Sequence, residues 1–366
     1  MDFVCSSCGH RESVDTYKAK CDKCGGLWKL DFTAPKFDLG KVDKKLWNIF
    51  RYRYFMPIEG DVWKSISLGE GMTPIINFDD GILFKMDYYM PTLSFKDRGA
   101  AMLISHCKSI GVKSVVQDSS GNAGDSVAAY CGRAGIKCEV FVPKNTSPKK
   151  IGMIRAHGAT CNVIQGSRDD CAEVCRTKVK REGVYYANHV YNPLFYEGTK
   201  TYIYEVYEQL GKIPKNIIIP LGNGTLFLGV IKALEEFLSA GIISKMPQII
   251  AVQSEHCDPF VKAVENKLKV PPKVEIKPTL AEGIAIGIPM RGKEILEYIY
   301  KYNIKVIAVP EEMILPTRGK LAAKGIFCEH TTAANYAAYL LYSKKYGKLS
   351  DCLIPMCGAG LKSEPW

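Results

Sequence analysis

From about residue 80 onward, short apolar runs alternate with segments whose apolar residues recur at helical spacing. Such runs predict buried strands, and the 3.6-residue period predicts amphipathic helices. Strands that alternate with helices favour parallel sheets with right-handed crossovers, and therefore an α/β fold. The predicted strands are 82–86, 114–117, 138–142, 160–164, 217–220, 249–252, 305–309 and 353–356. The predicted helices are 97–110, 122–134, 148–156, 169–181, 201–210, 226–238, 311–323 and 332–346.

The composition is that of an ordinary globular protein. Of 366 residues, 47% are hydrophobic and 24% charged, so the chain can form more than one packed core. The apolar stretch 217–231 is interrupted by Pro220 and by the loop at 222–224, which argues against a membrane span. The first residues lack a basic segment followed by an apolar one. We therefore expect a soluble, cytoplasmic protein.

The net charge of +11 changes the expected partners little. The positive residues are scattered along the chain and do not form one tract, which favours a solvated surface over a nucleic-acid-binding patch. We therefore expect neither a membrane nor a nucleic acid as a partner.

Fourteen cysteines fall into two groups. Ten are spread through apolar or helical segments, where cysteine acts as a small hydrophobe, and this usage indicates a reducing compartment. The other four form two Cys-x-x-Cys pairs in residues 1–33, Cys5 with Cys8 and Cys21 with Cys24. These pairs offer four thiolates to one tetrahedral Zn²⁺. We expect a structural zinc ribbon without catalysis, because a four-cysteine site leaves no open coordination position.

One lysine lies at an unusual place between a predicted strand and a predicted helix. The segment SFKDRG (94–99) puts Ser94 at the expected helix cap and Lys96 in the first turn. The partial positive charge of a helix N-terminus disfavours a cation there, so the pattern indicates a functional lysine. The same dipole increases the fraction of free amine, which bonding to an aldehyde requires. An ordinary surface lysine is the alternative that this segment alone leaves open.

Two further loops each follow a strand and open a helix. The first, SSGNAG (119–124), offers hydroxyls and backbone N–H groups that suit a carboxylate. The second, LGNGT (221–225), contains glycines that let the backbone approach a phosphate closely. Either loop alone is a weak signal, whereas both together with Lys96 are informative.

Together these segments resemble those of pyridoxal-phosphate-dependent enzymes of the tryptophan synthase β type, and most closely those of the threonine synthases. The resemblance extends to NPLFYEGTKT (192–201) and MCGAGLKS (356–363), so it covers nearly the whole chain. It implies an α/β fold of two doubly wound open sheets with a cofactor cleft between them, plus the small N-terminal zinc ribbon. The implied domains are the ribbon at 1–33, a large α/β domain at 34–85 and 190–366, and a small α/β domain at 86–189.

The resemblance also implies roles for single residues. Lys96 would be the catalytic residue, which bonds to the aldehyde of pyridoxal 5'-phosphate and later moves protons. The implied cofactor-binding residues are Phe95, Asn122, Gly222, Asn223, Gly224, Thr225, Leu226 and Cys357. The implied substrate-binding residues are Ser119, Ser120 and Ala123, around the substrate carboxylate. Cys357 would face the pyridine nitrogen, where a thiol cannot keep the nitrogen protonated as a carboxylate would.

The implied activity is that of a pyridoxal-phosphate-dependent, threonine-synthase-like lyase. It would eliminate or replace a side-chain group of a small L-amino acid, with O-phosphohomoserine to threonine as the leading reaction, and would form a homodimer. One alternative is a serine/threonine dehydratase or a cysteate-synthase-like β-replacement enzyme. Another is a non-catalytic protein whose ribbon contacts nucleic acid or a partner.

Several departures from the threonine synthase pattern leave the leaving group and the nucleophile open. Phe195 stands where the family has an arginine that grips phosphate, and Ala123 stands where it has a threonine. The segment 279–285 looks more like that of threonine dehydratases and serine racemases. Lys85 is an alternative cation for a phosphorylated substrate.

Overall fold

The computed structural model describes residues 1–363, apart from the side chain of Arg168. These residues form two compact units, and the chain crosses from one unit to the other more than once. Unit 1 consists of Met1–Gly71 and Lys96–Thr199, and unit 2 consists of Met72–Phe95 and Lys200–Trp366. The domain boundaries expected from the sequence stay a prediction. In the structure, residues 34–71 lie with 96–199.

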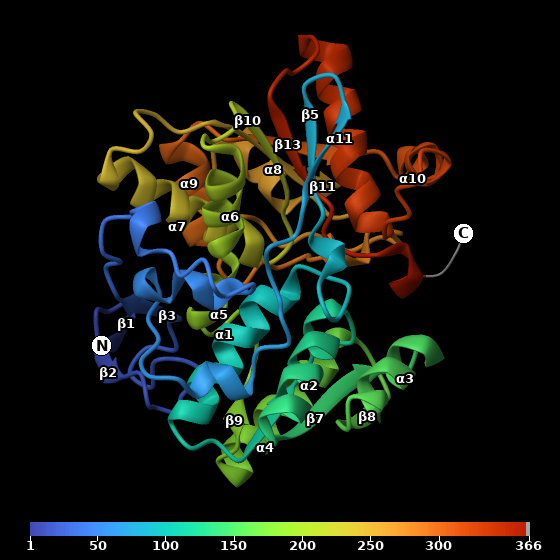
Figure 1. Cartoon of the computed structure of the whole chain (residues 1–366). Coiled ribbons are helices and arrows are strands. Elements are labelled where there is room, and N and C mark those ends of the chain that lie inside the picture. The colour runs from blue at the N-terminus through green and yellow to red at the C-terminus, as the bar shows by residue number, and fades with distance from the viewer. Residues whose placement is uncertain (364–366) are drawn as a thin grey trace. The chain divides into compact units, whose positions relative to one another are not determined.

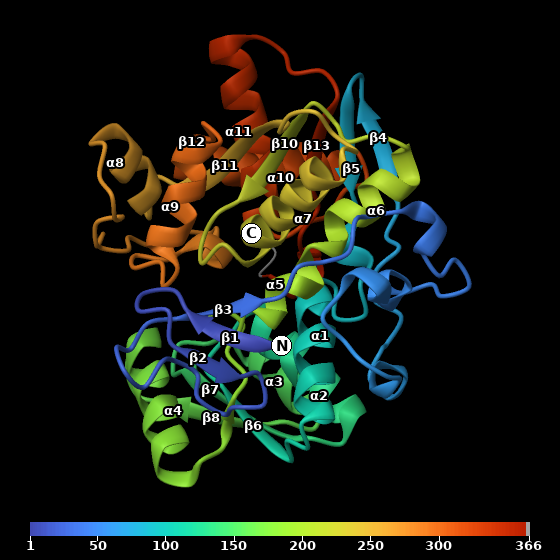
Figure 2. The same cartoon turned by 90° about the vertical axis from the view of Figure 1, so that its left-hand side faces the viewer.

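Unit 1 is built around a parallel sheet of four strands in the order β8-β7-β6-β9. The chain runs outward through β6, β7 and β8 and then returns to the other side of β6, so the sheet is doubly wound. Helices α1 and α2 lie on one side of it and α4 on the other (Figure 2). The elements are α1 Lys96–Ser109, β6 Ser114–Gln117, α2 Asn122–Ala134, β7 Lys137–Pro143, α3 Pro148–Ala156, β8 Thr160–Ile164, α4 Arg168–Glu182, β9 Tyr185–Tyr186 and α5 Leu194–Thr199.

Local chemistry explains where these helices begin and end. The Ser147 side chain accepts a hydrogen bond from the N–H of Lys150 at the start of α3, next to a proline in the first turn. Ser167 and Asp170 form a capping box at α4. Gly135 and Gly183 end α2 and α4 in the left-handed conformation that glycine adopts most easily.

The N-terminal segment of unit 1 forms a small antiparallel sheet in the order β2-β1-β3. Its strands are β1 Asp2–Cys5, β2 Arg11–Ser13 and β3 Trp28–Asp31, followed by the 3₁₀ turns η1 Leu39–Lys41, η2 Ile49–Phe55 and η3 Val62–Ser65. The sulfur atoms of the four ribbon cysteines lie within 4.8 Å of one another, close enough to share one ion. The turns after each pair place Gly9 and Gly25 at φ values of 71° and 73°, which favour glycine.

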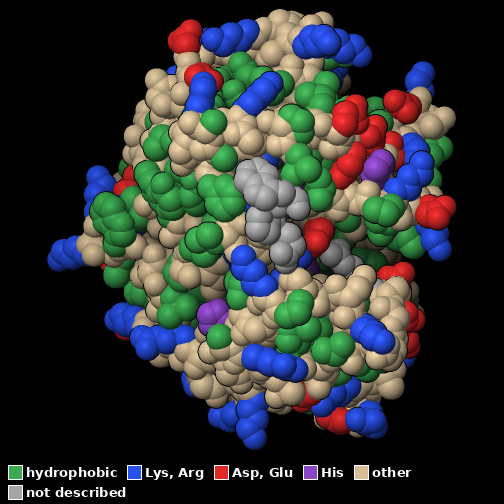
Figure 3. Space-filling view, turned by 90° about the vertical axis from the view of Figure 1, so that its right-hand side faces the viewer, with side chains coloured by type: hydrophobic (Ala, Val, Ile, Leu, Met, Phe, Trp, Pro, Cys, Tyr) green, Lys and Arg blue, Asp and Glu red, His purple; other side chains and the backbone are tan. Residues whose placement is uncertain are grey.

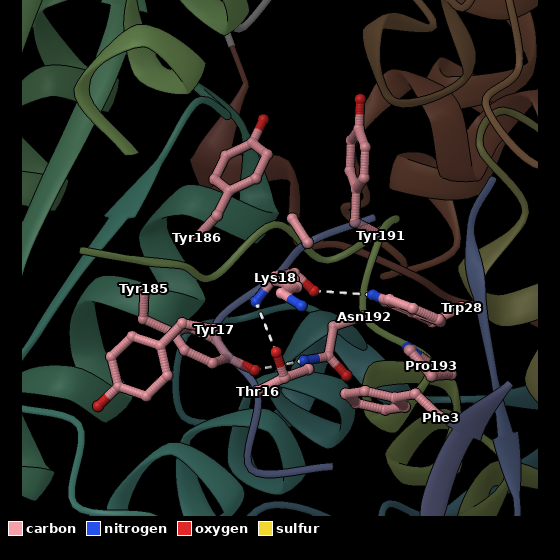
Figure 4. A pocket seen from close by; sticks show the side chains of 11 residues that line it. Phe3, Thr16, Tyr17, Lys18, Trp28, Tyr185, Tyr186, Tyr191, Asn192 and Pro193 are labelled. Carbon is pink, nitrogen blue, oxygen red and sulfur yellow. Dashed lines mark hydrogen bonds between the residues drawn. The ribbon is translucent and has the colours of Figure 1, made fainter. Parts of the chain in front are cut away.

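Aromatic residues attach this ribbon to the sheet of unit 1. The rings of Tyr17 and Tyr185 meet edge to face with centroids 5.3 Å apart, and the Lys20 ammonium lies 4.9 Å from the ring centroid of Tyr191. A pocket lies at this junction, and Figure 4 shows Trp28 donating a hydrogen bond to the carbonyl of Lys18 at its edge. None of the residues expected to bind cofactor or substrate lines this pocket.

Unit 2 contains a mixed sheet of six strands in the order β12-β11-β10-β13-β5-β4 (Figure 1). All neighbouring strands are parallel except β4 and β5. The strands are β4 Ile75–Asp79, β5 Ile82–Lys85, β10 Asn216–Pro220, β11 Gln248–Ser254, β12 Lys305–Val309 and β13 Cys352–Pro355. The helices are α6 Thr201–Leu210, α7 Thr225–Ala240, α8 Pro259–Glu265, α9 Gly292–Lys301, α10 Ile314–Ala323 and α11 His330–Tyr346. Short 3₁₀ turns are η4 Asp87–Tyr89, η5 Glu282–Ile284, η6 Glu311–Met313 and η7 Gly360–Lys362.

The core of unit 2 lies between this sheet and its helices. Small residues of α11, including Ala333, Ala334 and Ala337, pack against the apolar strand residues Ile218 and Ile354. Helices α6 and α7 lie on the opposite side of the sheet from α11 (Figures 1 and 2). Burial of both faces explains why β10 reads as a continuous apolar run and not as an alternating one.

The α/β fold is as predicted, but the antiparallel strand β4, which was not predicted, makes the sheet of unit 2 mixed and not purely parallel. Every predicted strand and helix from residue 82 onward is present, although 311–323 is divided into η6 and α10. The cofactor cleft between the sheets stays a prediction. No helix within residues 1–363 is both long and apolar enough to cross a bilayer. Lysine and arginine side chains are spread over the face that Figure 3 shows, as the sequence suggests.

Candidate active site

Lys96 is the first residue of α1, and its surroundings in unit 1 come from the packing of α1 against α5. A Cβ atom at Gly99 would lie 2.2 Å from the Phe195 ring, and one at Gly198 would lie 2.0 Å from the Arg98 carbonyl oxygen. Glycine at both positions therefore lets the two helices approach closely. The Lys96 ammonium lies 6.0 Å from the centroid of the buried Phe195 ring. Lys96 itself is only partly exposed.

His189 lies in the loop between β9 and α5, close to these residues. Its ring centroid is 5.6 Å from that of Phe195, with the planes inclined at 63°. Burial, and secondarily the positive charge of Lys96, hold the pKa of His189 well below its ordinary value. The imidazole is therefore neutral. Its Nδ1 atom is buried and has no hydrogen-bond partner among the described residues.

The loop after β6 carries the side chains expected to bind a carboxylate. Residues Ser119 and Ser120 are partly exposed in the turn, and Asn122 begins α2 with Gly121 as its cap. Asp118 accepts a hydrogen bond of 2.7 Å from the Asn188 amide, so its side chain ties the loop to the segment that contains His189. Burial raises the pKa of Asp118 above its ordinary value.

The Gln117 side chain holds that loop as well. The Gln117 amide donates a 2.7 Å hydrogen bond to the Ala187 carbonyl, and its amide oxygen accepts from the N–H of Asp118. A Cβ atom at Gly124 would lie 1.8 Å from the Ser119 carbonyl oxygen. Ala123 is buried. The loop is therefore held in place, with its hydroxyls at the start of a helix where anions bind well.

In unit 2, the glycine-rich turn leads from β10 into α7. Gly224 caps α7 with a φ of 78°, and no side chain caps the helix. A Cβ atom at Gly222 would lie 3.0 Å from the Gly283 carbonyl oxygen and from the Ile284 Cα atom. The Asn223 side-chain oxygen accepts a 3.4 Å hydrogen bond from the N–H of Met290. The first-turn N–H groups of α7, at Thr225 and Leu226, suit a phosphate.

Cys357 follows β13 in unit 2 and is buried. Its carbonyl accepts a 2.9 Å hydrogen bond from the N–H of Phe95, the residue directly before Lys96. The Asn335 amide lies 3.8 Å from the Cys357 sulfur, and its own oxygen is buried and has no hydrogen-bond partner among residues 1–363. Unit 2 thus combines a thiol and an amide with a main-chain tether to the segment that ends at the lysine.

Each unit separately contains groups that fit parts of pyridoxal phosphate. In unit 1 these are an amine for the aldehyde and polar side chains in the turn after β6. In unit 2 they are a glycine-rich turn that opens a helix without a side-chain cap, and a buried thiol beside an amide whose oxygen has no hydrogen-bond partner among the described residues. Buried polar atoms without partners are costly, and a bound polar ligand would satisfy them. The donor set therefore fits the cofactor.

Two residues do not act as the sequence suggested. The Ser94 hydroxyl has no hydrogen-bond partner among the described residues, so it does not cap α1. Lys85 is not an alternative phosphate ligand, because its ammonium is fully buried and lies 2.8 Å from the Glu205 carboxylate. Sequence reasoning missed His189 and Asn335. A histidine three residues before the motif at 192–201 is the signal that could have found His189, but Asn335 carries no such signal.

Known proteins resemble this chain over most of its length. The family model described as "Pyridoxal-phosphate dependent enzyme" matches residues 66–358. A threonine synthase of Methanocaldococcus jannaschii is 31% identical over 348 residues, which is 91% of this chain and 85% of that protein. A threonine synthase of Methanosarcina acetivorans is 30% identical over 346 residues, covering 91% of this chain and 84% of that protein.

Solved structures share the fold at lower sequence identity. Maize serine racemase superimposes with a TM-score of 0.68 at 20% identity, covering 79% of this chain and 88% of that one. The processed form of threonine deaminase isoform 2 from Solanum lycopersicum gives a TM-score of 0.71 at 19% identity, covering 91% and 95%.

Proposed function

The chain belongs to the pyridoxal-phosphate-dependent enzyme family and is a threonine-synthase-like lyase, and from this premise we propose that it eliminates or replaces a side-chain group of a small L-amino acid at Lys96. The observation that carries the proposal is the position of Lys96. It begins α1, where Gly99 lets the Phe195 ring approach closely. The residue before it, Phe95, donates its N–H to the Cys357 carbonyl.

We assign the other roles by the chemistry of the side chains. When bound, pyridoxal phosphate supplies an electron sink that makes the Cα–H bond of the substrate acidic. The Lys96 amine takes the proton from Cα and returns it. The hydroxyls of Ser119 and Ser120 and the backbone at Ala123 bind the substrate carboxylate. The cofactor ligands are the backbone of Gly222, Asn223, Gly224, Thr225 and Leu226 for the phosphate, Asn122 for the phenolic oxygen, Cys357 opposite the pyridine nitrogen, and Phe95 against the cofactor.

The leading substrate is O-phosphohomoserine, converted to threonine, because the similar curated proteins are threonine synthases. A second candidate, dehydration of serine or threonine or a cysteate-synthase-like β-replacement, is favoured by one observation. Phe195 is fully buried at the position of the expected arginine and offers no charge to a phosphate.

One assay separates these candidates. Protein purified with pyridoxal phosphate is given O-phosphohomoserine, L-serine or L-threonine, and inorganic phosphate, threonine and ketoacids are measured. Threonine and phosphate in equal amounts support the leading reaction. Ketoacid from serine or threonine without phosphate release supports dehydration, and no product from any of them contradicts both threonine formation and dehydration.

For the ribbon we propose one structural zinc ion held by Cys5, Cys8, Cys21 and Cys24, because their sulfur atoms lie within 4.8 Å of one another. Elemental analysis should find about one zinc per chain. Cys8→Ser should lose it, and Cys138→Ser, a buried cysteine on β7, should keep it. Metal-free protein with an intact ribbon would contradict the assignment.

We also propose a homodimer, as the family resemblance implies, located in the cytoplasm, as the cysteine usage indicates. Sedimentation of the purified protein should give twice the mass of the 40.7 kDa chain. A monomer at all concentrations would contradict the dimer.

A further inference from the structure

His189 is held in a fixed position by its neighbour in the chain. The Asn188 side-chain oxygen accepts hydrogen bonds from the N–H groups of Val190 and Tyr191, at 2.8 Å and 3.3 Å. The amide of the same side chain donates to Asp118, at the start of the loop that contains the two serines. The backbone of His189 therefore has little freedom, and its position is coupled to that loop.

The surroundings of the His189 ring in unit 1 combine one apolar and one reactive group. The Phe195 ring lies against it, and Lys96 is the charged residue that acts on its pKa. Since the imidazole is neutral, one ring nitrogen is a donor and the other an acceptor. A neutral imidazole beside an amine is able to donate a hydrogen bond to an oxygen without adding a second positive charge.

The Nδ1 atom of His189 is buried but makes no hydrogen bond with any described residue. Leaving such an atom without a partner costs free energy, so native structures rarely retain one without a reason. The residue as a whole is partly exposed, although its Nδ1 atom is buried. These features are typical of a group whose partner is a ligand.

We propose that His189 is a substrate-binding residue whose Nδ1–H donates a hydrogen bond to the oxygen of the side-chain group that leaves the substrate. This inference rests on the proposed function and narrows its substrates to amino acids with an oxygen on the side chain, either a free hydroxyl or a phosphate ester. In this proposal an uncharged imidazole recognises that oxygen. Residue 195 contributes no guanidinium, because it is a phenylalanine.

Three substitutions test the atom that makes the contact. His189→Asn keeps a polar atom at the place of Nδ1, His189→Gln keeps one at the place of Nε2, and His189→Phe keeps only the ring shape. For whichever substrate is turned over, KM should rise about tenfold in the Phe and Gln variants, which corresponds to about 1.4 kcal/mol at 25 °C. The Asn variant should stay within about threefold of the parent, and the absorption band of the bound cofactor should be the same in all.

Other kinetic outcomes contradict the proposal. An unchanged KM in the Phe variant would mean that Nδ1 binds only water. Rescue by Gln in place of Asn would assign the contact to Nε2. Substrates with a hydroxyl and with a phosphate ester are compared in the same variants, and the one whose KM responds identifies the oxygen.

A binding measurement gives a second readout that does not depend on turnover. The chain has six histidines, and the ¹⁵N imidazole signal of His189 is the one missing from the Phe variant. Adding L-serine or inorganic phosphate to the cofactor-loaded protein should shift this signal, whereas L-alanine, which lacks a side-chain oxygen, should not. No shift with either probe, or an equal shift with alanine, contradicts the role of His189. Lack of any turnover with a selective shift contradicts only the proposed reaction.

Discussion

The two units contain the same structural element with opposite chemistry. In each, a parallel strand ends in a turn that opens a helix, at 118–121 between β6 and α2 and at 221–224 between β10 and α7. The first turn is polar and is held by side chains, as in the contact between Asp118 and Asn188. The second is rich in glycine, and a main-chain contact holds its first residue, where the N–H of Leu221 donates to the Val252 carbonyl.

This difference teaches how one topology serves two kinds of anion. Hydroxyls suit a small carboxylate whose orientation matters, whereas closely packed backbone N–H groups suit a phosphate. If this division is correct, substitutions in unit 1 should change the reaction and the binding of substrate. Substitutions in the turn of unit 2 should mainly change the affinity for the cofactor.

The largest effect is expected at the amine of unit 1. Lys96→Ala should lower activity by about a thousandfold, because the group that moves the proton is removed. It should also abolish the absorption band near the edge of the visible range that the parent shows with pyridoxal phosphate. Lys108→Ala, on the same helix with its ammonium bound to the Ala134 carbonyl, is the matched control and should change neither. Normal turnover by the Lys96 variant would contradict the assignment of the reaction to the amine of unit 1.

Next in size is the effect of a methyl group where helix α2 packs against the polar turn. Gly124→Ala places a carbon 1.8 Å from the Ser119 carbonyl oxygen, so the backbone must move. We expect a loss of more than about 3 kcal/mol in the free energy of unfolding. At Gly121, the cap of the same helix, the new carbon meets no atom within 4 Å, so Gly121→Ala should be close to neutral. Urea denaturation measures both, and equal stabilities would mean that the turn is not constrained.

The buried carboxylates of the two units provide a third comparison. In unit 2, Glu205 is paired with the Lys85 ammonium. In unit 1, Glu70 accepts hydrogen bonds from the Ser67 and Tyr130 hydroxyls and from the N–H of Leu68, all neutral donors. Burial raises the pKa of Glu70 from 4.5 to about 7.

This pKa predicts a pH dependence of stability. Between pH 4.5 and 7 the folded protein keeps the Glu70 proton and the unfolded chain loses it. The stabilisation is therefore complete below pH 4.5 and is lost as the pH rises to 7, and it amounts to about 3 kcal/mol. Unfolding free energies of Glu70→Gln should lack this component, and the exposed Glu173→Gln should retain it. Parallel curves for all three proteins would contradict the prediction.

The smallest effect is expected in the glycine turn of unit 2. Gly224→Ala places a side chain at a φ of 78°, which costs about 1–2 kcal/mol, and the added carbon meets the flexible end of Ile295. We expect the affinity for pyridoxal phosphate to fall about tenfold, as measured by fluorescence titration. Gly241→Ala, with a φ of 75° at the other end of α7, has the same strain in open space. It should lose similar stability but keep its affinity for the cofactor.

The periodic part of the fold could be predicted from the sequence, and the short elements could not. Helix α5 has six residues and is buried on all sides, so it has no amphipathic pattern to detect. Strand β9 has two residues, which are too few for a period. Helix α9 is not among the predicted helices, although its sequence has a detectable pattern. Ile295, Leu296 and Ile299 form a buried stripe on an otherwise polar helix.

The candidate site also has a part that the sequence predicts and a part that it does not. Motifs that combine a turn with a helix start were visible because their chemistry is local, as at Lys96 and in both loops. The surroundings of His189 were not visible, because they depend on two glycines that let α1 and α5 approach closely. The buried pairing of Lys85 was also not visible, because its partner Glu205 lies 120 positions along the chain.

The hydrogen bond between the N–H of Phe95 and the carbonyl of Cys357 has a consequence for how this protein can evolve. Main-chain atoms are common to all residue types, so the anchor persists when the side chain at 357 is exchanged. Natural drift or laboratory selection can thus retune the electronic environment at that position while the reactive lysine keeps its alignment.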